Sequence, residues 1–235
     1  MTVRFLALSM AFAAISACVH TPNPIEAAKA PDPVLASGQP ASATAFSDFK
    51  AEIEDQLPRV EAIARLGARD QLVRQMINQW KKRPDMSAEQ RDAFISASAQ
   101  YMLETDQANT GELKRLMTDI SWRDLSNAGG DVFIKAFFVV QHSPDHAFQA
   151  EVLNELEPLV AEGLIDAQQY TYLFDRVQLR NGEQQLYGTQ MECVDGQYDV
   201  TDLQSPDTVD ERRIAVGLQP LEAYIQFVRD YSGAC

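Results

Sequence analysis

Apolar residues recur every three or four positions along most of the chain after residue 45, which is the spacing of one helix face. The first such stripe begins at Phe46 and continues to Trp80. It predicts one long amphipathic helix that ends before Pro84, or two helices broken near Pro58 or Gly67.

The pattern then divides into shorter elements. Ser87 followed by Gln90 is typical of a capping box and predicts a second helix that runs to Met102. We expect a short helix around residues 112–117. The segment 122–130 combines polar residues with two glycines at its end, and we interpret it as a loop.

The run 132–140 is almost entirely apolar, which predicts a buried central helix and, less well, a buried strand. Ser143 is placed to cap a following helix that ends near Gly163. Asp166 is placed to cap another.

Turn residues dominate the last third of the chain. Asn181-Gly182 and Asp195-Gly196 each separate two short runs of strand-forming residues and predict β-hairpins. A short helix that holds Arg212 and Arg213 is expected before Gly217, and Pro220 is expected to open a final helix. The predicted fold class is α+β, mainly α-helical, with a helical bundle-like core and a small antiparallel β-hairpin sheet in the C-terminal half.

The N-terminal residues have the pattern of a targeting signal. Arg4 is followed by 13 residues without a charge, too few to span a bilayer, where about 20 apolar residues are needed. Residues 1–17 are therefore predicted to be a signal peptide. Residues 18–45 contain five prolines and no aromatic residue, which predicts a disordered tether. A single globular domain is expected over residues 46–235.

The signal ends in Ile15-Ser16-Ala17-Cys18, which resembles the lipobox of bacterial lipoproteins. This resemblance implies cleavage before Cys18 and lipids on that residue, so that the partner would be a membrane. Val19 after the cysteine favours, by analogy with enteric lipoproteins, the outer membrane facing the periplasm. The alternative is an ordinary signal peptide with an incidental cysteine.

The formal net charge of −14 argues against nucleic-acid binding, because phosphate backbones need clustered cations. The acidity is concentrated in residues 145–211, which hold 15 acidic residues and only two basic ones, Arg176 and Arg180. Cations in or beside this stretch must neutralise acidic residues or attract an anion.

Cysteine use is sparse. After lipidation of Cys18, only Cys193 and Cys235 remain, and no spacing resembles a zinc or thioredoxin motif. We expect Cys193 to be a buried, unpaired residue and Cys235 a frayed terminal one; the alternative is a disulfide between them.

A series of short motifs lies in the part of the chain from about residue 130 to 225. The series comprises Gln141-His142, Phe148-Gln149, Asp175-Arg176, the run 185–190 and the run 209–218. Together they resemble a bacterial domain-of-unknown-function family, number 6624, over roughly residues 70–224. The family has no assigned activity, so the resemblance does not identify a catalytic residue or a cofactor.

His142 and His146 are four residues apart, which on one helix can hold a metal. Because Pro144 lies between them, we place them on separate helices and predict no metal site. His142 is either a structural residue or a general base, for which its ordinary pKa of about 6.5 is suitable.

Asp175 is expected near the end of a helix, where the helix dipole disfavours a carboxylate. It therefore needs a partner, which we expect to be Arg176, Arg212 or Arg213, or else His142. An ion pair is the structural interpretation, and orientation of His142 is the functional one.

The segment Tyr187-Gly188-Thr189-Gln190 is interpreted as a strand whose glycine marks a bulge or the close approach of a ligand. Its polar side chains and Gln141 are suited to hydrogen-bonding a polar ligand, or else to satisfying loop backbone.

Three functional hypotheses follow. The first is a lipid-anchored binding module for a small polar or anionic ligand, without a cofactor and with no protein partner predicted. Its ligand-binding residues are Gln141, Arg176, Tyr187, Thr189, Gln190, Arg212 and Arg213. The second is a hydrolase in which His142 is the general base and Asp175 orients it. The third is a purely structural lipoprotein.

Overall fold

The structure is a computed structural model that describes the backbone of residues 43–129 and 131–233, and side chains from residue 58 within these ranges. The described residues form eight α-helices and one two-stranded antiparallel sheet. This confirms the predicted mainly α-helical α+β class. The predicted signal peptide, Cys18 and nearly all of the predicted tether lie outside these ranges.

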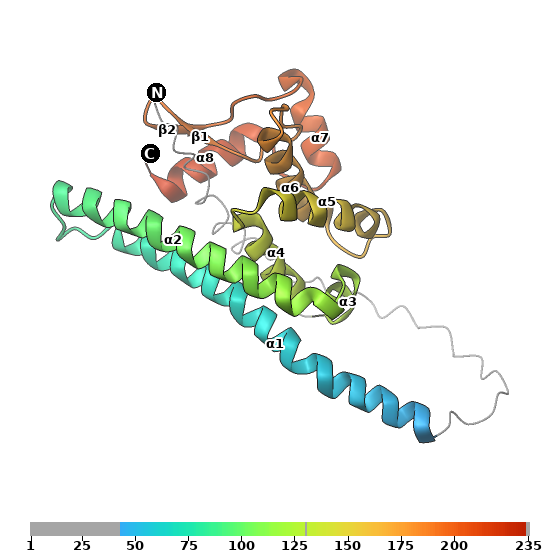
Figure 1. The fold of residues 1–235 in the computed structure, drawn as a ribbon. Helices are drawn as coiled ribbons and strands as arrows, with labels where there is room; N and C mark the ends of the chain where they lie inside the picture. Colours follow the sequence, from blue (N-terminus) through green and yellow to red (C-terminus); the bar gives the residue numbers. More distant parts are fainter. Residues whose placement is uncertain (1–42, 130, 234–235) are drawn as a thin grey trace, which may run out of the picture.

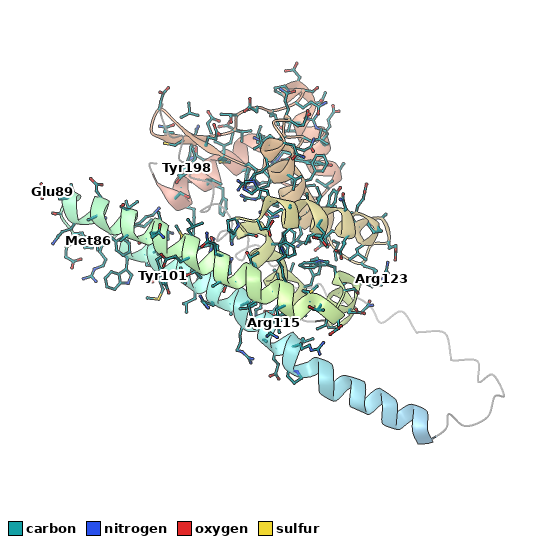
Figure 2. All side chains as sticks on the ribbon, viewed as in Figure 1. Met86, Glu89, Tyr101, Arg115, Arg123 and Tyr198 are labelled. Atoms are coloured by element: carbon teal, nitrogen blue, oxygen red, sulfur yellow. The ribbon has the colours of Figure 1, made fainter. Side chains whose placement is uncertain are left out.

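A long helical hairpin forms one side of the molecule. Helix α1 (Ala43–Trp80) and helix α2 (Ala88–Leu116) lie side by side (Figure 1). The turn between them, at Met86, lies at the opposite end of α2 from Arg123 (Figure 2). Helix α1 is continuous through Pro58 and Gly67, so the single-helix alternative is confirmed.

Helix α2 is longer than the sequence predicted. Ser87 forms the predicted capping box with Gln90, but the helix continues without a break to Leu116. In the middle of α2 the residues that face the interior are polar, and Thr105, Asp106 and Asn109 are all buried there. An apolar periodicity cannot detect this segment, which is why two helices were expected.

The predicted loop at residues 122–130 is wrong for most of its length. Helix α3 (Trp122–Asn127) begins there, after a short 3₁₀ turn at Met117–Asp119. Ser121 and Asp124 form a reciprocal capping box, with Asp124 N donating to Ser121 Oγ over 3.1 Å and Ser121 N donating to Asp124 Oδ2 over 2.8 Å.

Helix α4 (Val132–His142) is the centre of the core, as its apolar sequence predicted. It packs most closely on α1, where Gly67 faces Lys135. A Cβ atom on Gly67 would lie 2.3 Å from the Lys135 carbonyl oxygen, so only glycine allows this approach.

Helices α5 (His146–Ala161) and α6 (Ala167–Arg180) pair with each other, and both contact α4. The cap of α5 is Asp145, whose Oδ1 accepts from Phe148 N over 3.0 Å, rather than the predicted Ser143. Helix α6 extends to Arg180, so Asn181-Gly182 ends a helix and the hairpin predicted there is wrong.

The second predicted hairpin is confirmed. Strands β1 (Glu192–Val194) and β2 (Gln197–Asp199) pair around Asp195-Gly196, and both turn residues have positive φ. A 3₁₀ turn (Pro206–Thr208), helix α7 (Val209–Ala215) and helix α8 (Leu221–Ser232) complete the described chain.

Two further findings concern membrane-spanning helices and the cysteines. No helix within the described ranges has the length and apolarity to cross a bilayer. Cys193 is exposed and disulfide-bonded, which corrects the expectation of a buried, unpaired residue. Cys18 and Cys235 lie outside the described residues.

Candidate functional site

The predicted site residues separate into two groups in the structure. The first, which we call the loop cluster, holds the segment 185–190 and contains Asp175, Tyr187, Thr189, Gln190, Arg212 and Arg213. The second, which we call the interior cluster, lies between α1, α2, α4 and α6 and contains Asp70, Arg74, Asp106, Gln141, His142 and Arg176.

Asp175 organises the loop cluster. Its carboxylate accepts from Leu186 N over 2.7 Å, from Tyr187 N over 3.1 Å, and from Thr189 through both N (3.0 Å) and Oγ1 (2.9 Å). Burial raises the pKa of Asp175 above its ordinary value, although these bonds act in the opposite direction. Its partner is therefore the loop backbone, and the predicted arginine or His142 partner is wrong.

The two arginines of α7 bind the same loop through its carbonyl oxygens. Arg213 is fully buried and donates through Nη1 to Tyr187 O over 2.6 Å and through Nε to Gln219 O over 2.6 Å. Arg212 donates through Nε to Leu186 O over 2.8 Å. These cations replace missing backbone partners, because the segment is a loop and not the predicted strand.

Thr189 and Gln190 are buried and bonded within the protein. Gln190 N donates to Gln185 Oε1 over 3.0 Å, and Gln190 Nε2 donates to Tyr172 O over 3.2 Å. A Cβ on Gly188 would lie 3.0 Å from a Leu221 methyl group, so the chain's own side chains occupy the space that a ligand was predicted to approach. The loop cluster thus has the properties of a structural unit.

The interior cluster is a buried network around His142. His142 Nδ1 lies 2.9 Å from Asp70 Oδ2 and 3.0 Å from Asp70 Oδ1. Arg74 Nη1 donates to Asp70 Oδ1 over 2.8 Å, and its Nη2 donates to Asp106 Oδ2 over 2.8 Å. The carboxylate that contacts His142 is therefore Asp70 and not the predicted Asp175.

Burial and neighbouring charges set the protonation of this network. Burial, together with the charge of Arg74, lowers the pKa of His142 to about 4, while Asp70 acts in the opposite direction. Burial raises the pKa of Asp70, but His142 and Arg74 lower it by more, so the carboxyl stays ionised. Burial raises the pKa of Asp106 to about 6 despite Arg74. At neutral pH His142 is uncharged and its Nδ1–H donates to Asp70.

Arg176 has fewer hydrogen bonds than the other buried ions. Arg213 also has no ion pair among the described residues, but its Nε and Nη1 both donate to carbonyl oxygens and only its Nη2 is without a partner. It is 5% exposed, and its Nε donates to Gln141 Oε1 over 3.0 Å. Among the described residues, neither terminal nitrogen has an acceptor and no carboxylate pairs with the guanidinium. Burial and the nearby Arg180 lower the pKa of Arg176 to about 9, so it is charged at neutral pH.

Several buried amides of the helical core have unused hydrogen-bonding capacity, and two of them are linked to Arg176 through Gln141. Gln149 Nε2 donates to Val140 O and Gln141 O, but Gln149 Oε1 and Gln141 Nε2 have no partner in the described part of the chain. Both amide atoms of Asn109 on α2 are in the same state. Buried polar atoms are normally paired with protein or water, so these amides have capacity for a further hydrogen-bonding partner.

Sequence reasoning missed Asp70, Arg74, Asp106 and Asn109. The signal was present, because Asp70 lies seven residues from both Ile63 and Ile77, which are buried on the same face of α1. A polar residue at such a core-facing position predicts a buried polar site.

His142 and His146 do not share a helix. His142 ends α4 and His146 begins α5, where its Nε2 contacts Arg180 Nη1. Within the ranges that the structure describes, no group of three or more His, Cys, Asp or Glu residues could hold a metal ion.

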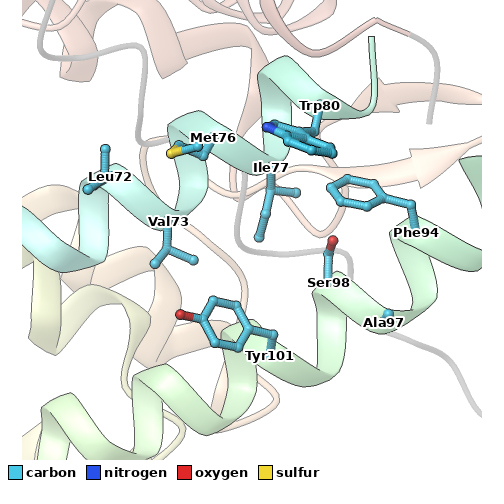
Figure 3. A pocket seen from close by; sticks show the side chains of 9 residues that line it. All are labelled: Leu72, Val73, Met76, Ile77, Trp80, Phe94, Ala97, Ser98 and Tyr101. Carbon is cyan, nitrogen blue, oxygen red and sulfur yellow. The ribbon is translucent and has the colours of Figure 1, made fainter. Parts of the chain in front are cut away.

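An apolar groove of about 530 Å³ lies elsewhere, between α1 and α2 near their connecting turn (Figure 3). None of the residues predicted for the site lines it. Its lining comprises Leu72, Val73, Met76, Ile77, Trp80, Phe94, Ala97, Ser98 and Tyr101.

Comparison with known proteins identifies the family of this chain. Residues 60–234 match a family described as a family of unknown function, DUF6624. No curated protein and no solved structure matches significantly. The match includes both clusters and the groove, and it supplies no activity for any of them.

Proposed function

Since the chain belongs to this family of unknown function, DUF6624, over residues 60–234, we propose a function from its candidate site. The protein is a binding protein of the cell envelope, and it binds a small anionic ligand at Arg176. The observation that carries the proposal is the buried Arg176 guanidinium, which within the described residues pairs with no carboxylate and uses only its Nε in a hydrogen bond. Charged groups removed from water are normally paired, since the cost of an isolated buried charge is several kcal/mol.

The charged groups that act on Arg176 support an anion and not a cation. Arg74 and Arg180 both act electrostatically on Arg176. The unpartnered Gln141 Nε2 is a donor. A small ligand fits the burial, because Arg176 is almost enclosed and a polymer could not reach it.

The test is a thermal-shift measurement with sodium salts of acetate, sulfate and phosphate, compared with chloride at equal ionic strength. At least one anion should raise the melting temperature of the wild type and not that of Arg176→Gln, because a ligand that binds only the folded state stabilises it. Arg123→Gln is the matched control, since Arg123 pairs with Glu162 at the surface. Equal shifts in all three proteins would contradict the proposal.

The lipid anchor is part of the same proposal and rests on the sequence around Cys18, which lies outside the described residues. We expect the protein in the membrane fraction of a bacterial cell and Cys18→Ser in the soluble fraction. Mass spectrometry of the purified protein should show an N-terminal Cys18 carrying acyl chains. An unmodified chain that begins elsewhere would contradict the anchor.

A second candidate is the hydrolase, and the contact between His142 and Asp70 favours it. A neutral histidine whose Nδ1–H is held by a carboxylate has the tautomer of a general base. We expect any hydrolysis of p-nitrophenyl acetate or phosphate to be lost in His142→Asn, with a fall in kcat and an unchanged KM. No turnover of either substrate above that of His142→Asn would count against it.

The third hypothesis, a purely structural role, agrees with the loop cluster but not with the interior cluster. The loop cluster uses its backbone amides, its carbonyl oxygens and most of its side-chain polar atoms in internal bonds, and the buried Arg213 Nη2 is the exception. In the interior cluster Arg74 Nε and Gln141 Nε2 have no partner among the described residues, and the same holds for Gln149 Oε1, whose amide donates to Gln141 O.

A further inference from the structure

We infer that the ligand of this site is a tetrahedral dianion, namely inorganic phosphate or the phosphoryl group of a monoester, and that Arg176 and Arg180 hold it together. The inference rests on the proposed anion binding at Arg176 and adds the ligand class and a second binding residue.

Arg180 lies one helical turn after Arg176 on α6, so the two side chains leave the same face of the helix. Arg180 Nη1 donates to His146 Nε2 at the start of α5. Its Nε is buried and has no acceptor among the described residues. Both arginines therefore face the connection between α4 and α5, Arg176 through Gln141 and Arg180 through His146.

The positive charges of Arg176 and Arg180 are not balanced by acidic side chains in the part of the chain that the structure describes. Arg176 and Arg180 are the only basic residues between positions 145 and 211, against 15 acidic ones, and neither forms an ion pair in the described part of the chain. Asp145 is near His146, but its carboxylate pairs with Lys114 over 2.8 Å. Two neighbouring cations without a counter-ion are best compensated by an anion with two charges.

The donors favour a tetrahedral anion over a planar carboxylate. The two terminal nitrogens of Arg176, Gln141 Nε2 and Arg180 Nε are donors without acceptors in the described residues. They come from two helices, α4 and α6. A guanidinium binds two oxygens of a phosphate side by side, and the remaining oxygens need donors from other directions.

The experiment is isothermal titration of the full chain at pH 8, where phosphate is a dianion, with inorganic phosphate, methyl phosphate, sulfate and acetate at constant ionic strength. Phosphate and sulfate should bind wild type at least ten times more tightly than acetate. Arg180→Gln should weaken phosphate at least ten-fold and change acetate less than two-fold. Arg180→Lys should fall between the two, because lysine keeps the charge but loses the planar fork.

Methyl phosphate identifies the source of the ligand. Binding as tight as that of inorganic phosphate, or tighter, supports a monoester, and weaker binding supports the free anion. Acetate binding as tightly as phosphate, or an unchanged phosphate affinity in Arg180→Gln, overturns the dianion while Arg176-dependent binding still supports the proposed function. No binding of any anion that depends on Arg176 overturns both. Melting temperatures of the ligand-free variants show that each is folded.

Discussion

Asp175 and Arg176 are neighbours in the sequence but have opposite surroundings. The Asp175 carboxylate receives hydrogen bonds from three backbone amides and one hydroxyl. The Arg176 guanidinium uses one of its nitrogens within the described protein. Both residues are buried, so burial alone does not separate the structural Asp175 from Arg176, the proposed ligand-binding residue, and the unused nitrogens of Arg176 are the difference.

Replacement of Asp175 by asparagine should be strongly destabilising. The substitution replaces one acceptor oxygen by an NH₂ group that faces the amide and hydroxyl donors, so buried donors lose their partner. We expect a loss of about 3 kcal/mol in the free energy of unfolding, measured by urea denaturation. Asp207→Asn is the control, since Asp207 is exposed, and it should change stability by less than about 0.5 kcal/mol. Similar losses in both variants would count against the assigned role.

The interior cluster should give the protein two opposing pH dependences. The pKa of His142 is lowered to about 4, so between about pH 6.5 and pH 4 the unfolded chain binds a proton that the folded chain does not. His142 therefore makes the free energy of unfolding decrease as the pH falls. The pKa of Asp106 is raised to about 6, so the folded chain holds the extra proton below that pH. Asp106 therefore makes the free energy of unfolding increase as the pH falls.

Single substitutions should reveal each contribution. Asp106→Asn leaves the His142 contribution, so this variant should lose more stability than wild type between pH 7 and pH 4.5. His142→Asn leaves the Asp106 contribution, so it should lose less. Urea unfolding at both pH values measures the difference, and the double variant is the reference for all other groups. Slopes equal to that of wild type in both single variants would show that these pKa shifts are absent.

At the scale of the elements, the crossing of α1 and α4 brings Asp70 to His142. Gly67 touches Lys135 at the crossing, and Asp70 follows one turn later on α1. The sequence predicted both helices from their apolar spacing. It did not predict the crossing, because glycine in a helix was interpreted as a possible break and its close approach to another helix depends on a distant segment.

Gly67→Ala should destabilise the protein by about 2 kcal/mol, because the new Cβ overlaps the Lys135 backbone and forces α1 away from α4. Gly111→Ala in α2 is the matched control, since a Cβ there meets no atom within 4 Å. The control should gain up to about 1 kcal/mol, as alanine favours the helix. Denaturant midpoints of the two variants measure the contrast, and a stabilised Gly67→Ala would refute the close crossing.

At the scale of the whole molecule, the interior cluster joins the α1–α2 hairpin to the C-terminal part. Arg74 on α1 pairs with Asp106 on α2, and Asp70 contacts His142 at the end of α4. A second connection lies near the hairpin turn, where Lys82 Nζ donates to Tyr231 O over 2.7 Å. Arg74 is the cation shared by two buried carboxylates.

Arg74→Met should therefore weaken the whole fold. It leaves Asp70 and Asp106 buried without their shared counter-ion, which costs about 3–5 kcal/mol. Arg115→Met is the control, because Arg115 pairs with Glu112 at the surface and should change stability by less than about 1 kcal/mol. Thermal unfolding followed by circular dichroism compares them. A melting temperature for Arg74→Met equal to that of the control would refute the central position of Arg74.

The sequence by itself determined the class of the fold, the central helix α4, the capping box at Ser87 and the hairpin at Asp195-Gly196, because these depend on spacing and turn residues within about ten positions. Only the tertiary structure decided which polar residues are partners. Asp70 lies 72 positions from His142 in the chain, and Asp175 binds a loop that local alternation predicted as a strand. Such partners depend on how helices cross, and local spacing contains no information about that.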